Sequence, residues 1–131
     1  MIYTTYLSNL KNLPNDNTTK KFLITRWKPR NTIDVKKYNI EWAPQLAPTE
    51  LTLAKYKDGS IDWKEYRQRY IDESFDNPFF IDGLKEIIDL NNEGYTIFLI
   101  CYEKNDIICH RSILREILEY NNQECKEYRK E

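Results

Sequence analysis

Residues 95–101, Tyr-Thr-Ile-Phe-Leu-Ile-Cys, constrain the fold of this chain more than any other segment. The run is β-branched, aromatic and apolar at both odd and even positions, so a strand built from it buries both of its faces. Apolar residues at helical spacing flank the run, at about residues 79–91 and 110–121. A doubly buried strand between helices predicts an α/β fold, in which helices pack on both faces of a mostly parallel sheet.

The rest of the chain alternates between short apolar runs and helical patterns. Its length suits a single domain over residues 1–131, because a chain of this size buries one core and leaves little room for two. Residues 42–49 are expected to be extended, since residues before proline are steered away from helix. Residues 124–131 are expected to form a charged, frayed tail. The remaining elements are expected as strands at residues 2–7 and 22–26 and as helices at residues 50–57 and 62–76.

The composition argues against several classes of protein. Aromatic residues make up 14% of the chain, which argues against disorder. The net charge of −1 argues against a binder of duplex DNA, which usually has a clear excess of basic residues. No apolar run is long enough to span a bilayer and no signal-peptide pattern opens the sequence, so we expect a cytoplasmic protein with no membrane association. The cysteines lack a Cys-x-x-Cys pair and fit reduced thiols in that compartment.

Basic residues are concentrated between residues 20 and 37. Only one acid, Asp34, lies in this segment, and its bases are Lys20, Lys21, Arg26, Lys28, Arg30, Lys36 and Lys37. One interpretation is an ordinary solvated face, and the other is a patch that attracts anions. Aromatic residues interleave with the bases, which suits single-stranded nucleic acid better than duplex.

A polar cluster follows the apolar run. Cys101 and Glu103 lie where the predicted strand ends. Cys109, His110 and Arg111 lie where the next predicted helix begins, and a helix N-terminus favours anions and lowers the pKa of a thiol. Ligands of α/β proteins bind beyond the carboxyl ends of the strands, so this junction is the first place to look for a site. We therefore interpret Cys101 or Cys109 as a candidate nucleophile, and His110 or Glu103 as the proton-transfer group.

Each of these residues also has a structural interpretation. Cys101 at the end of a core strand can be a packing residue, and His110 can hydrogen-bond a carbonyl. Glu103 can form a structural ion pair with Arg111. A metal site of Cys101, Cys109 and His110 is a weaker alternative, because the spacing matches no common zinc pattern. The sequence therefore predicts no metal ligands and implies no cofactor.

Several motifs resemble the domain-of-unknown-function 488 family. The C-terminal signature of that family is an apolar strand, Cys-x-Glu, a short loop and Cys-His-Arg before a helix, and residues 99–112 resemble it. The likeness covers residues 22–118, although Trp27 falls one position early and Asn31 stands where the family has glycine. The other matching segments are 26–30 (Arg-x-Trp-Pro-Arg in the family), 46–49 (Leu-Ala-Pro-Ser/Thr) and 63–70 (an aromatic helix).

The resemblance implies a small, single-domain α/β protein with a Rossmann-like sheet, and it assigns no reaction. The polar cluster favours a small enzyme or binding protein for a phosphorylated or nucleotide-like ligand. If the strands before Arg26 and Arg111 are neighbours, then Arg26, Arg30 and Arg111 face one pocket and bind the anionic group. The side chains expected to wall this pocket and stack on a base are Trp27, Trp42, Tyr66 and Tyr70.

Two other functions fit the same residues. One is a non-catalytic module that binds single-stranded nucleic acid or a protein through the basic segment 20–37, with a binding strength that falls steeply with salt. The other is an interaction protein in which the polar cluster is a buried hydrogen-bond network. Abundant Lys, Asn, Ile and Tyr suit an AT-rich bacterial or phage genome. The oligomeric state is not readable from the sequence.

Overall fold

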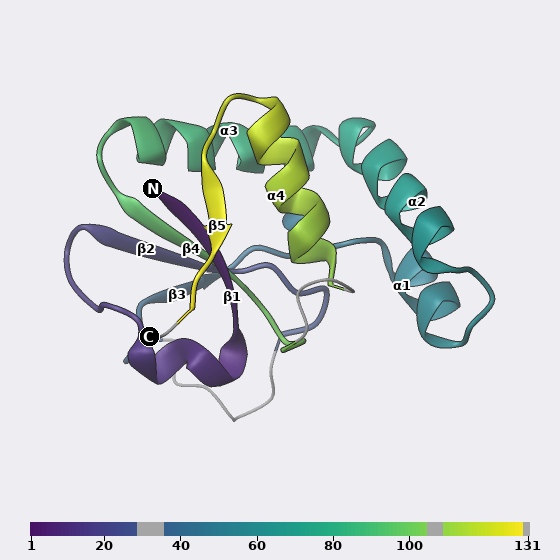
Figure 1. Cartoon of the computed structure of the whole chain (residues 1–131), viewed down its shortest axis with the longest axis horizontal. Helices are drawn as coiled ribbons and strands as arrows, with labels where there is room; N and C mark the ends of the chain where they lie inside the picture. The colour runs from purple at the N-terminus through teal and green to yellow at the C-terminus, as the bar shows by residue number, and fades with distance from the viewer. Residues whose placement is uncertain (29–35, 105–108, 130–131) are drawn as a thin grey trace.

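The computed structural model describes residues 1–28, 36–104 and 109–129. Its centre is β4 (Thr96–Cys101), which is the apolar run singled out above, and every residue of this strand after Thr96 is buried. The other strands are β1 (Ile2–Tyr6), β2 (Thr19–Leu23), β3 (Ile40–Trp42) and β5 (Cys125–Glu127). They form one sheet in the order β3-β2-β4-β1-β5, and all neighbours run parallel (Figure 1). The predicted α/β fold with a parallel sheet is confirmed.

Successive side chains of β4 enter two different apolar clusters, one on each face of the sheet. Leu99 belongs to the cluster that contains the apolar faces of α3 (Pro78–Asn92) and α4 (His110–Tyr120). Phe98 belongs to the opposite cluster, where η1, a 3-10 helix over Leu7–Asn12, covers the sheet. Helices therefore lie on both faces, as predicted, but the long ones gather on one face and a short 3-10 helix lies on the other.

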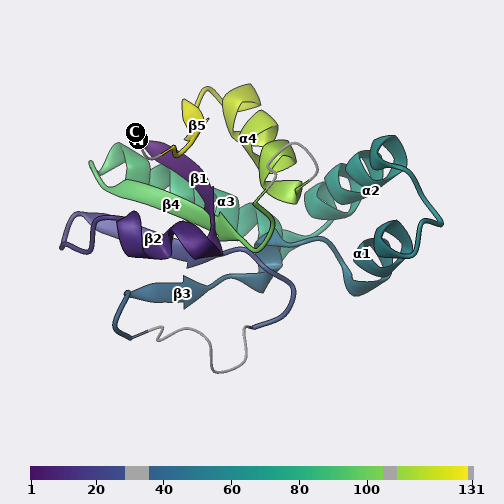
Figure 2. The same ribbon diagram turned by 60° about the horizontal axis from the view of Figure 1, so that its bottom comes forward.

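The helices α1 (Glu50–Lys57) and α2 (Trp63–Phe75) form a pair beside the sheet (Figure 2). Aromatic rings fill their interface: the centroid of the Tyr66 ring lies 4.5 Å from that of Tyr56 and 5.3 Å from that of Trp63. Trp63 and Tyr66 of α2 thus pack against Tyr56 of α1.

Side-chain caps explain where these two helices begin. Thr49 Oγ1 accepts a hydrogen bond from Thr52 N at 3.3 Å at the start of α1. Asp62 Oδ1 accepts one from Glu65 N at 2.8 Å at the start of α2. Such caps satisfy backbone N–H groups that have no partner inside the helix.

The C-terminal segment corrects one prediction. Cys125–Glu127 forms β5, an edge strand parallel to β1, and not a frayed tail. The Cys125 side chain is buried, and the Glu127 carboxylate forms an ion pair with Arg111. A buried thiol and a buried ion pair anchor a strand too short and too charged to be recognised in the sequence.

Residues 42–49 are extended in part, as expected, and in part helical. Trp42 ends β3, and the 3-10 helix η2 (Pro44–Leu46) follows it. None of the helices in the described part of the chain has both the length and the apolar character needed to cross a membrane.

Candidate functional site

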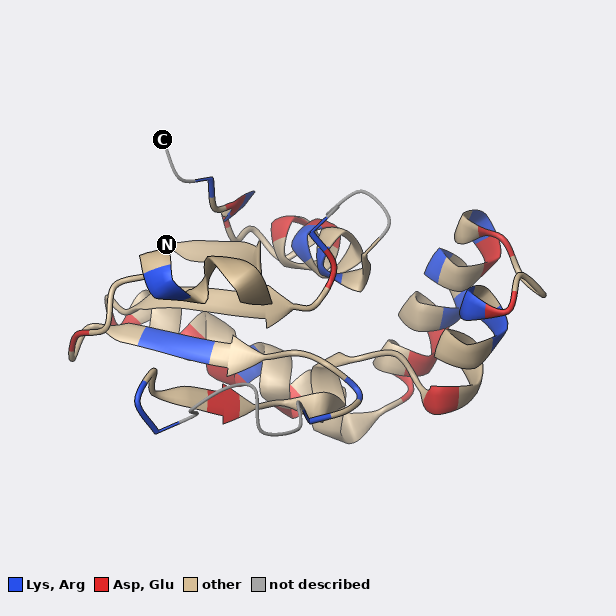
Figure 3. Cartoon of the chain, turned by 90° about the horizontal axis from the view of Figure 1, so that it is seen from below, with Lys and Arg blue, Asp and Glu red and all other residues tan. Residues whose placement is uncertain are grey.

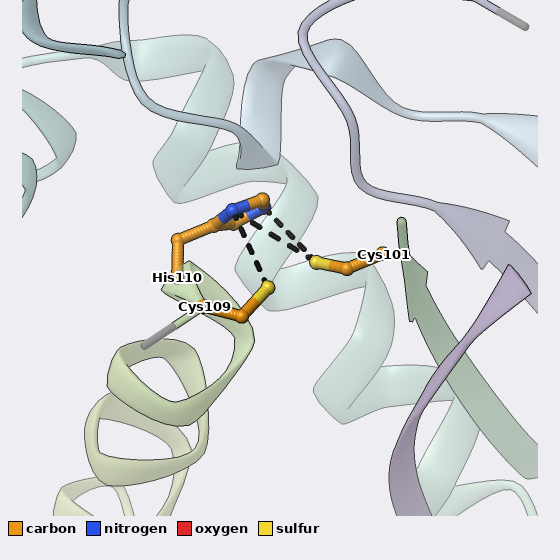
Figure 4. Close-up of side chains that lie close together, drawn as sticks. All are labelled: Cys101, Cys109 and His110. Atoms are coloured by element: carbon orange, nitrogen blue, oxygen red, sulfur yellow. Dashed lines mark hydrogen bonds between the residues drawn. The ribbon is translucent and has the colours of Figure 1, made fainter. Parts of the chain in front are cut away.

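The candidate site lies where β4 ends and α4 begins. Cys101 is the last residue of β4, Cys109 immediately precedes α4, and His110 is the first residue of that helix. All of these side chains are buried, and they point toward one another (Figure 4). Cys101 Sγ lies 3.4 Å from His110 Nε2 and 3.8 Å from His110 Nδ1, and Cys109 Sγ lies 4.0 Å from Nδ1. The fold thus brings together three of the four residues predicted to be catalytic.

Strand β2 contributes a backbone group to this cluster. β2 pairs with β4, so the condition that these strands be neighbours is confirmed. Just beyond β2, the carbonyl oxygen of Ile24 lies 2.6 Å from His110 Nε2. A carbonyl only accepts hydrogen bonds, so Nε2 carries a proton and donates it, and Nδ1 is the nitrogen left to interact with the sulfurs.

The two thiols of the cluster differ in acidity. The pKa of Cys109 is lowered to about 4, chiefly because the Cys101 thiol donates a hydrogen bond to it and further because His110 lies beside it, and these contacts outweigh its burial. The pKa of Cys101 is raised well above its ordinary value, because the side chain is buried and because Cys109 lies against it. Cys109 is therefore the thiolate of the pair, and Cys101 keeps its proton.

The third cysteine shows what burial does without such partners. Cys125 in β5 is buried, and burial raises its pKa to about 12. It remains a neutral thiol at every physiological pH. Among the described cysteines, Cys109 alone has the ionised sulfur that thiol chemistry requires.

Arg111 lies in an internal network of hydrogen bonds. Its side chain is fully buried, and its Nε and Nη2 atoms donate to the two carboxylate oxygens of Glu127 at 3.0 and 2.9 Å. The same guanidinium also donates to the carbonyl oxygens of Glu103 and Lys104. Arg111 thus fastens the loop after β4 and the strand β5 to the first turn of α4 through these internal hydrogen bonds.

The predicted arginine pocket is not assembled by the described residues. Arg26 donates from Nε and Nη2 to the carbonyl oxygens of Pro48 and Ala47 at 2.9 and 3.2 Å. The surface hollow that it lines, about 570 Å³, also carries the acids Asp82 and Glu86, which disfavour an anion. The third arginine of the prediction, Arg30, lies outside the described residues.

The predicted aromatic wall divides into two parts. Tyr66 and Tyr70 are core residues: Tyr70 is completely buried, its hydroxyl donates to Leu46 O at 2.6 Å, and its ring centroid lies 5.7 Å from that of His110. Burial raises the pKa of both phenols. Trp27 and Trp42, in contrast, are 56% and 39% exposed. Only these two are available to stack on a ligand.

The exposed aromatic side chains are anchored to the backbone after β2. Trp42 Nε1 donates to Thr25 O at 2.9 Å, and the hydroxyl of Tyr102, which is 44% exposed, donates to Trp27 O at 3.3 Å. Tyr102 was not predicted as a site residue, although its place directly after Cys101 could have indicated it. The backbone that holds these rings is continuous with Ile24, the partner of His110.

Two acidic residues near the site differ from the prediction: Glu103 lies outside the buried cluster, and Glu127 was not predicted. The side chain of Glu103 is exposed, and its described contribution is the carbonyl that accepts from Arg111. Glu127 was missed because its segment was expected to fray. A buried arginine in the first turn of a core helix needs a nearby acid to balance its charge. The need for such a partner of Arg111 was the signal that could have led to Glu127.

The described basic residues of the segment 20–37 do not form one continuous exposed patch. Lys21 is 3% exposed, and its ammonium donates to Asn15 Oδ1 at 3.0 Å and to Tyr38 O at 2.8 Å. Burial lowers the pKa of this lysine. Lys20 lies over the ring of Tyr95, 5.0 Å from its centroid. Lys20 and Lys21 are neighbours in β2, and of the two only Lys20 faces solvent; Figure 3 shows how Lys and Arg residues, in blue, are spread over the chain.

Comparison with known proteins gives one match. The model of the family DUF488-N3a, described as the active DUF488-N3 subclade, matches residues 5–122. No curated protein and no solved structure matches the chain.

Proposed function

The chain belongs to the DUF488-N3a family, and from that premise we propose that it is a thiol-dependent enzyme in which Cys109 is the nucleophile. The observation that carries this proposal is the position of Cys109 Sγ at the start of α4, against the Cys101 thiol and the His110 imidazole. The family description as an active subclade agrees with it.

The surroundings of Cys109 suit nucleophilic attack. Backbone N–H groups at a helix N-terminus stabilise negative charge, first on the thiolate and then on a substrate anion bound beside it. In the proposed step, Cys109 Sγ forms a bond to an electrophilic centre, and the bond to the leaving group breaks with its electron pair. Water then attacks the covalent intermediate: its oxygen bonds to the electrophilic centre, the bond to Cys109 Sγ breaks and restores the thiolate, and one proton of the water replaces the proton that was given to the leaving group.

Two groups can supply the proton that the leaving group needs. The Cys101 thiol holds a proton in a hydrogen bond to Cys109. His110 donates its Nε2 proton to Ile24 O and presents the lone pair of Nδ1 to both sulfurs, so Nδ1 can take up a proton from a thiol and pass it on. The exposed carboxyl group of Glu103 is a third, more distant candidate. Transfer from Cys101 or His110 uses contacts that already exist, so we assign the proton to this pair.

We assign a phosphorylated or nucleotide-like molecule as the ligand. Exposed Trp27 and Trp42 lie at the carboxyl ends of β2 and β3, on the same edge of the sheet as Cys101, and indole rings stack on planar bases. Lys28, which is exposed directly after Trp27, and the start of α4 support a negatively charged group on that ligand.

A labelling experiment tests the nucleophile. Metal-free, reduced protein is treated at pH 6 with a small haloacetamide, and the modified cysteine is mapped by mass spectrometry. We expect modification of Cys109 in the wild type, none at that site in Cys109→Ser, and unchanged modification in Cys125→Ser. Equal labelling of all three cysteines, or labelling that needs alkaline pH, would contradict the proposal.

A ligand panel tests the substrate class. Nucleotides, sugar phosphates and inorganic phosphate are compared by thermal shift, using wild type and Trp27→Ala. A ligand at a hundred times its dissociation constant stabilises the folded state by ~2.7 kcal/mol, which raises the melting temperature by several degrees. We expect a shift with nucleotides that Trp27→Ala reduces. If no nucleotide changed the melting temperature, the proposal of a nucleotide-like ligand would be wrong.

A further inference from the structure

We propose that Cys101, Cys109 and His110 also form a binding site for Zn²⁺. Their donor atoms all lie within 4.8 Å of one another, the side chains are buried, and they come from two elements that meet at one edge of the sheet (Figure 4). Thiolate sulfur and imidazole nitrogen are donors that Zn²⁺ prefers in proteins. This inference concerns binding alone and stands whether or not Cys109 is a nucleophile.

The separations of the donor atoms suit a tetrahedral ion. With Zn–S of about 2.3 Å and Zn–N of about 2.0 Å, a tetrahedral ion holds a sulfur and a nitrogen ligand about 3.5 Å apart and two sulfur ligands about 3.8 Å apart. His110 Nδ1 lies 3.8 Å from Cys101 Sγ and 4.0 Å from Cys109 Sγ. Rotation of the side chains is enough to close the small difference. Three protein ligands leave the fourth position open to water or to another small ligand.

The backbone carbonyl of Ile24 orients His110 as a metal ligand. His110 Nε2 donates to Ile24 O at 2.6 Å, which leaves the lone pair on Nδ1, the nitrogen nearest to Cys109. Histidines that bind metal ions typically donate their second ring N–H to a carbonyl or carboxylate, and this contact fixes the orientation of the ring. The Ile24 carbonyl supplies that contact without any ion.

The charges of the site also favour a divalent cation. Two thiolates balance the charge of Zn²⁺, so the ion would leave the buried cluster neutral, whereas a lone buried thiolate is costly. Binding releases the proton of Cys101. Coordination uses the electron pair with which Cys109 attacks, so Zn²⁺ would inhibit the proposed reaction.

Cobalt substitution tests the site directly. Full-length protein is reduced with a phosphine, stripped of metal with a chelator and titrated with Co²⁺. We expect one Co²⁺ per chain, a near-ultraviolet thiolate-to-cobalt charge-transfer band, visible bands of a tetrahedral ion, and loss of all these bands when Zn²⁺ displaces the cobalt.

Matched variants locate the ligands. Cys125→Ser removes a buried cysteine outside the cluster and should leave the spectrum unchanged. Cys101→Ser and Cys109→Ser should each lose about half of the charge-transfer intensity, since each removes one of two thiolates. His110→Gln should weaken binding and keep the thiolate band. Circular dichroism establishes that each variant is folded.

Zinc X-ray absorption on the wild type makes the test independent of the variants. We expect a first shell with two sulfurs and one imidazole nitrogen. A Co²⁺ titration without a charge-transfer band, a zinc shell without sulfur, or a band lost in Cys125→Ser would each overturn the proposal. The labelling experiment on Cys109 uses metal-free protein, so failure of the zinc site and failure of the nucleophile are distinguishable.

Discussion

Two buried cysteines lie at opposite ends of α4 and have opposite acidities. Cys109 precedes the helix, and its pKa is lowered to about 4. Cys125 follows it in β5, and its pKa is raised to about 12. Both side chains are almost completely shielded from solvent, at 2% and 4% exposure. Burial alone therefore does not determine whether a thiol ionises; the hydrogen-bond donors around it do.

Arg111 connects these two environments. It lies in the first turn of α4, two residues after Cys109, and its ion pair with Glu127 holds the strand that contains Cys125. One guanidinium thus fixes both the loop at the thiolate and the edge strand around the neutral thiol. A substitution of Arg111 should therefore disturb the surroundings of both cysteines.

The largest expected effect is that of Arg111→Met. Removing one partner of a buried ion pair leaves the Glu127 carboxylate with the Thr4 hydroxyl at 2.7 Å and Arg115 at 3.3 Å as its described partners, and costs about 3 kcal/mol of unfolding free energy. Thermal denaturation should show a fall in melting temperature of roughly 10 °C. Loss of β5 should also make Cys125 reactive toward a thiol reagent.

Arg67→Met is the matched control for Arg111→Met. Arg67 pairs with Glu116 at 2.8 Å, but both side chains are exposed, at 42% and 57%. Exposed pairs contribute about 0–1 kcal/mol, so this variant should melt close to the wild type. Equal destabilisation by the two substitutions would refute the role assigned to Arg111.

The pH dependence of stability should have opposite signs for the two thiols. Cys109 has a folded pKa of about 4, below the value of ~8.5 in an unfolded chain. Between these values the unfolded chain binds the extra proton, so stability rises with pH by up to ~1.4 kcal/mol per unit and is lost as pH falls toward 4. For Cys125 the folded pKa is about 12, so its effect appears only above about pH 8.5, where stability falls.

Urea unfolding of metal-free protein between pH 5 and 8 measures this slope. Cys109→Ser should flatten it, and Cys125→Ser should leave it unchanged. A wild type whose slope equals that of Cys109→Ser would show that Cys109 is not ionised in the folded state.

A smaller effect is expected at Cys101, the largest single cause of the low pKa of Cys109. Cys101→Ala removes the hydrogen-bond donor, and a hydrogen bond to a charged group contributes about 1.5–3 kcal/mol. The pKa of Cys109 should rise from about 4 toward the ordinary value of a thiol. Thiolate absorbance in the far ultraviolet follows this titration. Cys101→Ser keeps a hydroxyl donor and should give the smaller rise; an identical rise in both variants would argue against the hydrogen bond.

The sequence predicted the centre of the molecule better than its edges. The doubly apolar run at 95–101 indicated a central parallel strand, because burial on both faces leaves few alternatives. β5 was not predicted because Cys125–Glu127 is short and charged. The strand is held by Arg111, which is distant in the sequence. Short edge strands depend on such tertiary contacts, which no local pattern records.

The candidate site was predicted in part for the same reason. Cys101, Cys109 and His110 were identified because they flank a strand end and a helix start, which always face one edge of a parallel sheet. Sequence spacing argued against a metal site, since the donors are separated by a loop and not by the short spacers of common zinc motifs. The Ile24 carbonyl could not be found at all, because a backbone oxygen has no signature in the sequence.

Cys125→Ala should change the protein least, and it tests whether the two ends of α4 are independent of each other. Cys125 packs as an apolar side chain, so its loss should cost about 1 kcal/mol, measured by urea unfolding at pH 7. The Cys109 titration, haloacetamide labelling and Co²⁺ spectrum should all match the wild type. If Cys125→Ala altered them, the two ends of α4 would be coupled through the helix or through Arg111. Their independence would mean that the acidity of Cys109 is set entirely by the side chains and backbone groups within reach of its sulfur.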